Sequence, residues 1–139
     1  MITTTSEYAI RAVGYLTNSE DDVRIGSDEI AEATHVPKRF LLKILNTLKN
    51  QGILRTSRGI GGGFSLAKDP KKLTLFDVVS VFEDISRFSH CLSGDQNCSS
   101  ENPCPLHKKW NAILEKMEDL LKGTTFSHYR EYKKLHEKS

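Results

Sequence analysis

The chain has 139 residues, of which 37% are apolar and 27% are charged, so it can bury a hydrophobic core and does not belong to the disordered class. No apolar run approaches the length of a membrane span, and the first residues lack the features of a signal peptide, so we expect a cytoplasmic protein with reduced thiols. The net charge of +2 conceals an asymmetry, because residues 35–72 carry nine basic side chains and one acidic side chain. A basic block in an otherwise acidic chain favours a polyanionic partner such as nucleic acid.

The first two helices follow from apolar periodicity and capping signals. Thr4 and Glu7 have the spacing of a capping box, and apolar residues then recur at helical intervals, which predicts a helix over about residues 5–17. Ser27 is expected to cap a short second helix, because the acidic residues that follow it favour a helix N-terminus. A tight turn is expected after this second helix.

A third helix is predicted from Pro37, which suits the first helical position, to about Gln51, with Gly52 as its C-terminal stop. Its expected buried stripe consists of Phe40, Leu41, Ile44, Leu45 and Leu48. Its other faces carry the basic residues Lys38, Arg39 and Lys43. Two helices joined by a short turn, the second of them amphipathic and basic, form a helix-turn-helix signature.

A glycine-rich turn separates two short extended segments, residues 53–57 and 64–67, which predicts a β-hairpin. After a helix-turn-helix, such a hairpin is the wing of a winged helix, and Arg55 and Arg58 at its base and tip could reach phosphates or a minor groove. The glycines could instead belong to a nucleotide-binding loop. The segment lacks the Gly-Lys-Ser/Thr ending and does not open a helix, so this alternative carries little weight.

Thr74 is expected to cap a fourth helix, and a longer helix is predicted after the cysteines, ending at Gly123. The longer helix carries apolar residues at alternating spacings of four and three, namely Leu106, Trp110, Ile113, Met117 and Leu120. This spacing is typical of a coiled-coil seam, so a symmetric homodimer is the simplest arrangement. Packing of the helix onto the chain's own first helix is the alternative, and the two arrangements are compatible.

All three cysteines, Cys91, Cys98 and Cys104, lie in one polar stretch, which indicates a loop. A free cysteine is ordinarily buried, and an odd number does not suit a disulfide framework, so metal or redox chemistry is favoured. Six and five residues separate successive cysteines. These intervals exceed those of a zinc knuckle and favour an iron–sulfur cluster.

The fourth ligand is less determined by the sequence. If Pro105 is the first helical position, Cys104 is the N-cap residue, where the helix dipole favours a thiolate, and His107 lies in the same first turn. His107 is therefore favoured as a ligand over its alternative role as a surface histidine. Glu7, supplied across a dimer by the first helix, is the other candidate ligand, although capping with Thr4 is its more expected role.

Three segments together resemble a known family: residues 37–45, the wing motif Arg58-Gly-x-Gly-Gly-Gly-Phe64 within residues 52–64, and the three-cysteine loop. Over nearly its whole length the chain is similar to the bacterial family of transcription regulators that includes IscR and NsrR. The resemblance implies a dimeric winged-helix DNA-binding protein that carries one iron–sulfur cluster in each subunit.

The resemblance also bears on the ligands and on the operator. In the IscR type, three cysteines and a histidine hold a 2Fe–2S cluster, a pattern that is matched, with one extra residue in the first interval, by Cys91, Cys98, Cys104 and His107. In the NsrR type, the fourth ligand is an acidic residue near the N-terminus of the partner subunit, a place close to Glu7. A 4Fe–4S cluster therefore remains an alternative. Leu42 stands where IscR-like proteins often carry glutamate, so the target sequence is expected to differ.

The expected fold is mainly α, with a winged helix-turn-helix domain that has a two-stranded wing and a long C-terminal dimerisation helix. The expected units are residues 1–88 for DNA binding, residues 89–107 as the cluster-binding loop, and residues 105–139 as the dimerisation helix and tail. The expected DNA contacts are Ser27, Lys38, Arg39, Lys43, Arg55, Arg58 and Gly61.

The expected function is a homodimeric transcriptional regulator, a repressor in particular, that binds a palindromic double-stranded DNA operator. An iron–sulfur cluster, with 2Fe–2S favoured over 4Fe–4S, would control binding in response to nitric oxide, oxygen or redox state, or iron–sulfur status. The alternatives are a winged helix with a structural zinc site and a thiol/disulfide redox switch. The chain has no convincing nucleophile–base constellation, so we expect neither an enzyme nor a small-molecule substrate, and no membrane partner.

Overall fold

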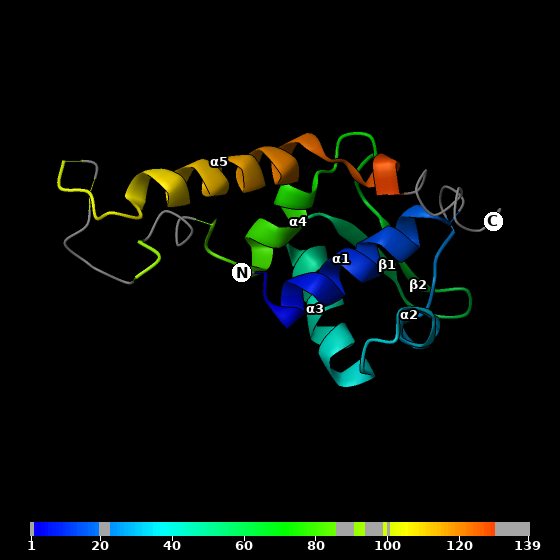
Figure 1. Cartoon of the computed structure of the whole chain (residues 1–139). Helices are drawn as coiled ribbons and strands as arrows, with labels where there is room; N and C mark the ends of the chain where they lie inside the picture. The colour runs from blue at the N-terminus through cyan, green and yellow to red at the C-terminus, as the bar shows by residue number, and fades with distance from the viewer. Residues whose placement is uncertain (1, 20–22, 86–90, 94–98, 100, 130–139) are drawn as a thin grey trace, which may run out of the picture.

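The structure is a computed structural model that describes residues 2–19, 23–85, 91–93, 99 and 101–129 (Figure 1). In chain order its elements are α1 (Thr4–Thr17), α2 (Ser27–Thr34), α3 (Lys38–Asn50), β1 (Leu54–Ser57), β2 (Gly63–Leu66), α4 (Leu75–Phe82) and α5 (His107–Gly123). Helices with one two-stranded antiparallel sheet confirm the mainly α winged-helix prediction. None of the helices that the structure describes is long and apolar enough to cross a bilayer.

α1 is the central helix, because α2, α3, α4 and β2 all pack against it. Its cap differs from the predicted one. Thr3 has an extended backbone and its hydroxyl accepts a hydrogen bond from the Ser6 N–H at 3.3 Å. Thr4 is already helical, so it cannot be the cap, and the predicted capping box of Thr4 with Glu7 is wrong. Glu7 is instead an exposed residue of the first turn.

α2 begins one residue earlier than a cap at Ser27 would place it. Gly26 occupies the N-cap position and Ser27 is the first helical residue, so the prediction that Ser27 caps this helix is wrong. The reason lies in the preceding residue, since Ile25 pairs with Phe64 of β2 through two backbone hydrogen bonds of 2.9 and 2.8 Å. This isolated β-bridge keeps the chain extended up to Gly26 and ties it to β2 of the hairpin.

The turn between α2 and α3 combines one left-handed residue with one contact to α1. His35 adopts a left-handed conformation (φ 57°) after the last residue of α2. The Arg11 guanidinium of α1 donates a hydrogen bond to the Thr34 carbonyl at 2.9 Å, and a cation there also suits the negative end of the helix dipole. The helix-turn-helix is therefore fixed to α1 at its corner.

α3 ends as predicted and begins one residue later. Pro37 is the N-cap residue and not the first helical residue, while Gly52 takes a positive φ of 77° just after the helix. Four of the five residues predicted to be buried are buried. Phe40 is the exception, with 42% of its surface exposed, because it lies at the edge of the stripe, where the Arg39 guanidinium stacks on its ring at 4.6 Å.

The hairpin has the predicted segments to within one residue, with Leu54 paired to Leu66 and Ser57 paired to Gly63. Between the strands, Gly59 and Gly61 have φ values of 94° and 77°, a region that side-chain-bearing residues rarely adopt. The glycine-rich sequence therefore serves the backbone of the turn.

α4 carries the capping box that α1 lacks. The Thr74 hydroxyl accepts from the Asp77 N–H at 3.1 Å, and the Asp77 carboxylate accepts from the Thr74 N–H at 3.0 Å. Both bonds satisfy amides at the start of a helix that has only eight residues, which confirms Thr74 as its cap.

We predict that Thr74→Ala lowers the free energy of unfolding by about 1 kcal/mol, because it removes this cap. The measurement is urea denaturation at one fixed protein concentration. Thr47→Ala is the matched control, since the Thr47 hydroxyl bonds only to the Lys43 carbonyl within α3 and its loss should change stability by less than about 0.5 kcal/mol. Equal effects of the two substitutions would contradict the prediction.

After α5 the chain returns to the core. The Leu75 N–H donates to the Thr124 carbonyl and the Phe126 N–H donates to the Leu73 carbonyl, both at 2.9 Å. Phe126 is completely buried, and the ring of Tyr129 lies where a Cβ on Gly14 of α1 would be. The C-terminal end of α5 is thus anchored to the winged-helix core. The division into units at residues 88 and 105 stays a prediction.

Candidate DNA-binding surface and cysteine loop

The basic residues predicted on α3 are exposed. Lys38, Arg39 and Lys43 all lie at the surface, on faces away from the buried leucines. Lys38 forms an ion pair with Asp28 of α2, and both side chains are more than half exposed. Such an exposed pair contributes little to stability, so Lys38 can exchange Asp28 for another anion at small cost.

The predicted contacts on the hairpin are also at the surface. Arg55 lies at its base, where its guanidinium approaches the Ala67 carbonyl at 3.5 Å. Arg58 and Gly61 lie in the exposed turn between the strands. Ser27, in contrast, is half-buried at the start of α2.

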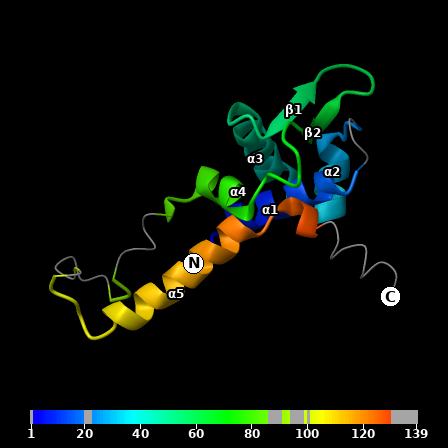
Figure 2. The same ribbon diagram turned by 90° about the horizontal axis from the view of Figure 1, so that it is seen from above.

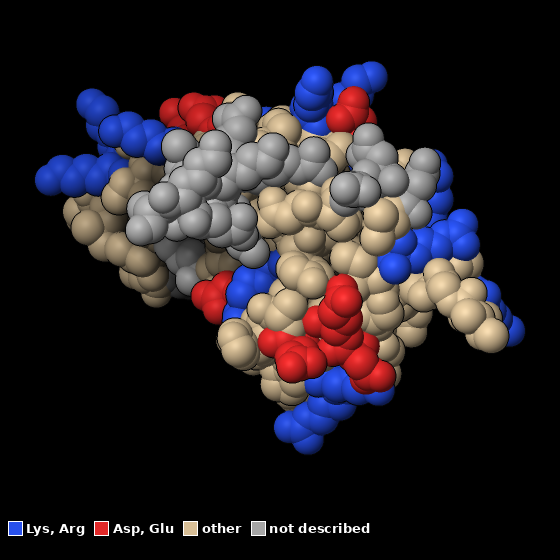
Figure 3. All heavy atoms as spheres, turned by 90° about the vertical axis from the view of Figure 1, so that its right-hand side faces the viewer, with Lys and Arg blue, Asp and Glu red and all other residues tan. Residues whose placement is uncertain are grey.

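α3 and the hairpin share one side of the molecule, and α5 lies on the other (Figure 2). Figure 3 looks onto the right-hand side of Figure 1, which carries α2 and the turn of the hairpin, and acidic side chains gather in the lower part of that face beside basic ones at its bottom edge. α2 contributes exposed carboxylates to this side with Asp28, Glu29 and Glu32. α3 and the hairpin thus expose basic side chains, whereas α2 exposes carboxylates.

One carboxylate of α2 also fixes the helix in place. The Tyr15 hydroxyl of α1 donates a hydrogen bond to Glu29 at 3.1 Å. Burial, followed by the hydrogen bond and the negative charge of Glu29, raises the pKa of Tyr15 above its ordinary value of 10.0. The hydroxyl therefore stays protonated and remains a donor throughout the physiological pH range.

Two of the three predicted thiol ligands meet at the start of α5. The Sγ atoms of Cys91 and Cys104 are 3.2 Å apart, and both side chains are half-buried. The Ser93 hydroxyl lies 3.0 Å from the sulfur of Cys91. Cys98 lies outside the described residues.

His107 is close to these thiols in sequence, but the helix start differs from the predicted one. α5 begins at His107 with Leu106 as its N-cap residue, so the prediction that Cys104 caps the helix is wrong. The residues Pro105 and Leu106 form a turn that is closed by a 3.1 Å hydrogen bond from the His107 N–H to the Cys104 carbonyl. The His107 ring lies 3.0 Å, through Nε2, from the Asn111 side-chain amide one turn later.

Among the described residues, Glu7 does not join the cysteines in a metal-binding group. Across the part of the chain that the structure describes, no three His, Cys, Asp or Glu side chains gather into a metal-binding group. Two thiols in contact, with an imidazole one short turn away, nevertheless have the donor chemistry that iron–sulfur clusters and zinc require. The described residues therefore fit part of such a site.

α5 divides its apolar residues between two surfaces. Leu114 and Leu121 are buried, and α5 packs against α4. Three residues of the predicted seam are exposed: Leu106 by 45%, Ile113 by 55% and Leu120 by 60%. Within one chain, the described residues leave these three of the five predicted seam residues uncovered.

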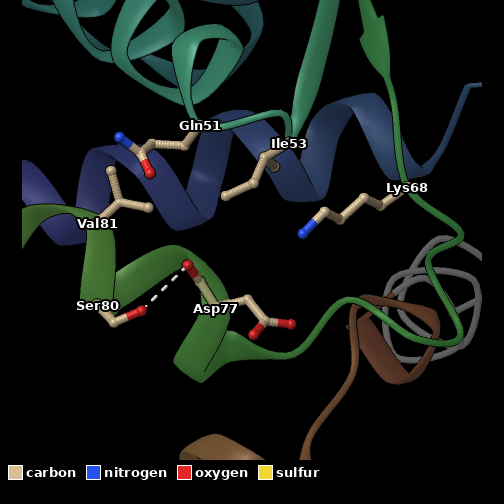
Figure 4. Close-up of a pocket in the computed structure, with 6 residues that line it drawn as sticks. All are labelled: Gln51, Ile53, Lys68, Asp77, Ser80 and Val81. Atoms are coloured by element: carbon tan, nitrogen blue, oxygen red, sulfur yellow. Dashed lines mark hydrogen bonds between the residues drawn. The ribbon is translucent and has the colours of Figure 1, made fainter.

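A cleft of about 210 Å³ separates the C-terminal end of α3 from α4 (Figure 4). Its lining residues are Gln51, Ile53, Lys68, Asp77, Ser80 and Val81. The Lys68 side chain extends across it toward α4, and the Asp77 carboxylate already serves the cap of that helix. None of these residues belongs to the predicted contacts, so the cleft is separate from both candidate sites.

The sequence prediction missed two features of the hairpin and of the segment paired with it. Ile60, in the turn of the wing, is fully exposed, although its neighbours were recognised as a wing. Ile25 forms a β-bridge to Phe64, and the sequence signal for it was the β-branched pair of Val23 and Ile25 before a glycine.

Comparison with known proteins places these features in context. The chain matches the family model Rrf2, described as iron-dependent transcriptional regulator, over residues 2–129. An HTH-type transcriptional regulator described from Aquifex aeolicus (strain VF5) is 37% identical over 123 residues, which cover 87% of this chain and 85% of the relative.

Two solved structures share the fold. The structure of CymR, described as the global cysteine regulator of B. subtilis, has a TM-score of 0.80 and 21% identity, covering 95% of this chain and 97% of CymR. The structure of T. potens IscR has a TM-score of 0.72 and 20% identity, covering 91% of this chain and 83% of that protein.

Proposed function

The chain belongs to the Rrf2 family of transcriptional regulators, and from this premise we propose that it is a homodimeric repressor whose DNA binding is controlled by an iron–sulfur cluster in the loop of residues 91–107. It is a DNA-binding regulator and not an enzyme. The observation that carries the cluster proposal is the contact of Cys91 with Cys104 beside an exposed apolar stripe of α5.

The proposed ligands are Cys91, Cys98, Cys104 and His107, with Glu7 of a partner subunit as the alternative fourth ligand. When bound, the cluster supplies a thiolate-ligated iron centre that responds to oxidants and to nitric oxide. The chain's own contribution is to hold two thiols together at the start of α5 and to keep His107 in its first turn. The family description as iron-dependent supports this proposal, and 2Fe–2S is favoured because the histidine is present.

Anaerobic purification tests the cluster directly. We expect the protein to absorb visible light and to contain iron and acid-labile sulfide. Colourless protein with stoichiometric zinc would overturn the proposal in favour of a structural zinc site. Mössbauer spectra of the wild type, His107→Ala and Glu7→Ala then identify the cluster type and the fourth ligand, because only loss of a true ligand changes the iron environment.

The proposed DNA surface consists of Ser27, Lys38, Arg39, Lys43, Arg55, Arg58 and Gly61. α3 is the proposed recognition helix in the major groove, and the wing reaches the adjacent backbone or minor groove. Leu42 is 38% exposed on α3 and can contact a thymine methyl group but cannot accept from cytosine. Two half-sites about one helical turn apart would suit a symmetric dimer.

We predict that Lys43→Ala and Arg58→Ala each reduce the salt dependence of DNA binding by about one unit of slope, because each removes one phosphate contact. The measurement is the dissociation constant across a series of salt concentrations, with a duplex that the wild type selects from a random library. Lys116→Ala is the control, since Lys116 is an equally exposed lysine on α5, on the other side of the molecule. An unchanged slope for both variants would contradict the proposed surface.

A thiol switch is the second candidate, favoured by the same 3.2 Å separation of Cys91 and Cys104. Oxidation of these two thiols to a disulfide, with a two-electron oxidant such as a peroxide, would lock the loop to the start of α5 without any metal. Metal-free protein that binds DNA in one thiol state and not in the other would support this function over the cluster.

A further inference from the structure

Ile60 is an apolar side chain with no partner in its own chain's core. It lies in the turn of the wing and its relative exposure is 111%, the highest among the exposed large hydrophobic residues of the described part. A β-branched apolar residue is unusual in a turn, where polar residues and glycine are preferred. The turn itself does not need isoleucine, since Gly59 and Gly61 supply its positive φ values of 94° and 77°.

The backbone around Ile60 is tightly constructed. The Gly62 N–H donates to the Gly59 carbonyl at 3.0 Å, and a Cβ on Gly62 would lie 2.9 Å from that same oxygen. Below the turn, Phe64 is held by its two hydrogen bonds to Ile25. A side chain on a closed turn of this kind loses little conformational freedom when a partner covers it.

The surroundings of Ile60 indicate what that partner is. Arg58 lies two residues before it, and the whole segment of residues 35–72 is strongly basic. The wing lies on the side of α3 and at the opposite end of the molecule from the described residues of the cysteine loop, in both Figure 1 and Figure 2. A polyanion is therefore the partner that this end of the molecule attracts.

We propose that Ile60 is an apolar wedge that enters the DNA minor groove beside the half-site, partly unstacks one base step and bends the duplex. This inference rests on the proposed contact of the wing with DNA and adds a residue and a deformation to it. Apolar side chains inserted from the minor groove bend DNA toward the major groove by roughly 20–90°. Pyrimidine–purine steps unstack most readily, so such a step is expected where the wing meets the operator.

The wedge can be tested because Arg58 and Ile60 would contribute to DNA binding in different ways. Arg58 acts through charge, so its loss should lower the salt slope, whereas Ile60 acts through apolar burial and should leave the slope unchanged. The decisive variants are Ile60→Ser, which removes the apolar surface, and Ile60→Val, which keeps it with one methylene fewer. Because the side chain is fully exposed, neither variant should change the unfolding midpoint.

The experiment uses the full-length protein and the duplex selected by the wild type from a random library. Bending is measured by circular permutation of the site, and unstacking by the fluorescence of 2-aminopurine placed at successive steps of the flank. We expect Ile60→Ser to weaken binding on the order of tenfold, to reduce the bend and to abolish the fluorescence increase, with the salt slope preserved. Ile60→Val should retain most of each effect.

The outcomes separate this inference from the proposed function. Wild-type protein that selects no DNA sequence would remove the DNA surface itself. Wild-type protein that binds with an unchanged slope for Arg58→Ala would remove the wing contact. If Ile60→Ser binds and bends the duplex as the wild type does, the wedge is overturned, and the exposed isoleucine would then serve a protein partner.

Discussion

Replacing Cys104 with serine is expected to abolish the visible absorption and the acid-labile sulfide of anaerobically purified protein. Cys104 is one of two thiols in contact at the start of α5, and serine is a poor ligand for the soft iron of such a cluster. The measurements are the visible spectrum together with iron and sulfide content per chain. DNA affinity should then become the same under oxidising and reducing conditions, because the proposed sensing group is absent.

Glu101→Gln provides the matched control for this substitution. Glu101 is an exposed residue three positions before Cys104 in the same loop, and it is not among the proposed ligands. The variant should keep the colour and the iron content of the wild type. A Cys104→Ser protein that also keeps the colour and the iron content would show that Cys104 is not a ligand. The metal site would then have to be formed by other residues of the chain.

Replacing Ile113 with glutamate is expected to convert the proposed dimer to a monomer. Ile113 lies in the middle of the uncovered stripe of α5 and is 55% exposed, so a single folded chain should tolerate the charge. In a symmetric dimer the substitution places a carboxylate in each copy of the seam, where burial of an unpaired charge is strongly unfavourable. Sedimentation velocity measures the mass, and circular dichroism verifies that α5 remains helical.

Loss of the dimer should weaken binding to a palindromic duplex by roughly 10²–10⁴-fold, because the second half-site is no longer bound at a high effective concentration. Ala112→Glu is the control, since residue 112 is also exposed but points about 100° around the helix from Ile113. A dimer that persists in Ile113→Glu at micromolar concentration would show that another surface joins the two chains.

The elements of the winged helix could be predicted because each has a local cause. The amphipathic pattern of α3, the glycines of the wing and the Thr74 capping signal act over a few residues, and all three appear where expected. The exposed stripe of α5 was also readable as a spacing of four and three, although only the structure shows which residues of that helix face α4.

The errors arise where distant parts of the chain decide the local structure. Ser27 has the sequence of a cap, but pairing of Ile25 with Phe64, nearly forty residues away in sequence, fixes Gly26 in that position. Cys104 has the sequence of a cap before a proline, but the chain makes one extra turn before α5 begins. Phe40 fits the apolar period, yet its ring lies beside Arg39 at the surface.

The fourth ligand could not be settled from sequence for a related reason. His107 and Glu7 belong to different elements, and a ligand from a second chain leaves no spacing signal in the first. The same holds for Ile60, whose neighbours fit a wing perfectly while its own exposure depends on the closed geometry of the turn.

α5 packs against the rest of its own chain along only part of its length. From Leu114 to its C-terminal end it rests on α4 and on the returning chain, whereas its first two turns overhang the core, a length of roughly 10 Å at the rise of an α-helix (Figures 1 and 2). This overhang carries both the cysteine loop and the first part of the uncovered stripe. In the proposed dimer, binding of the proposed cluster beside this overhang and association of the two chains would be thermodynamically linked, and such linkage is reciprocal. The cluster would then strengthen the dimer by the same factor by which dimerisation strengthens cluster binding, and we expect retention of the cluster to depend on protein concentration.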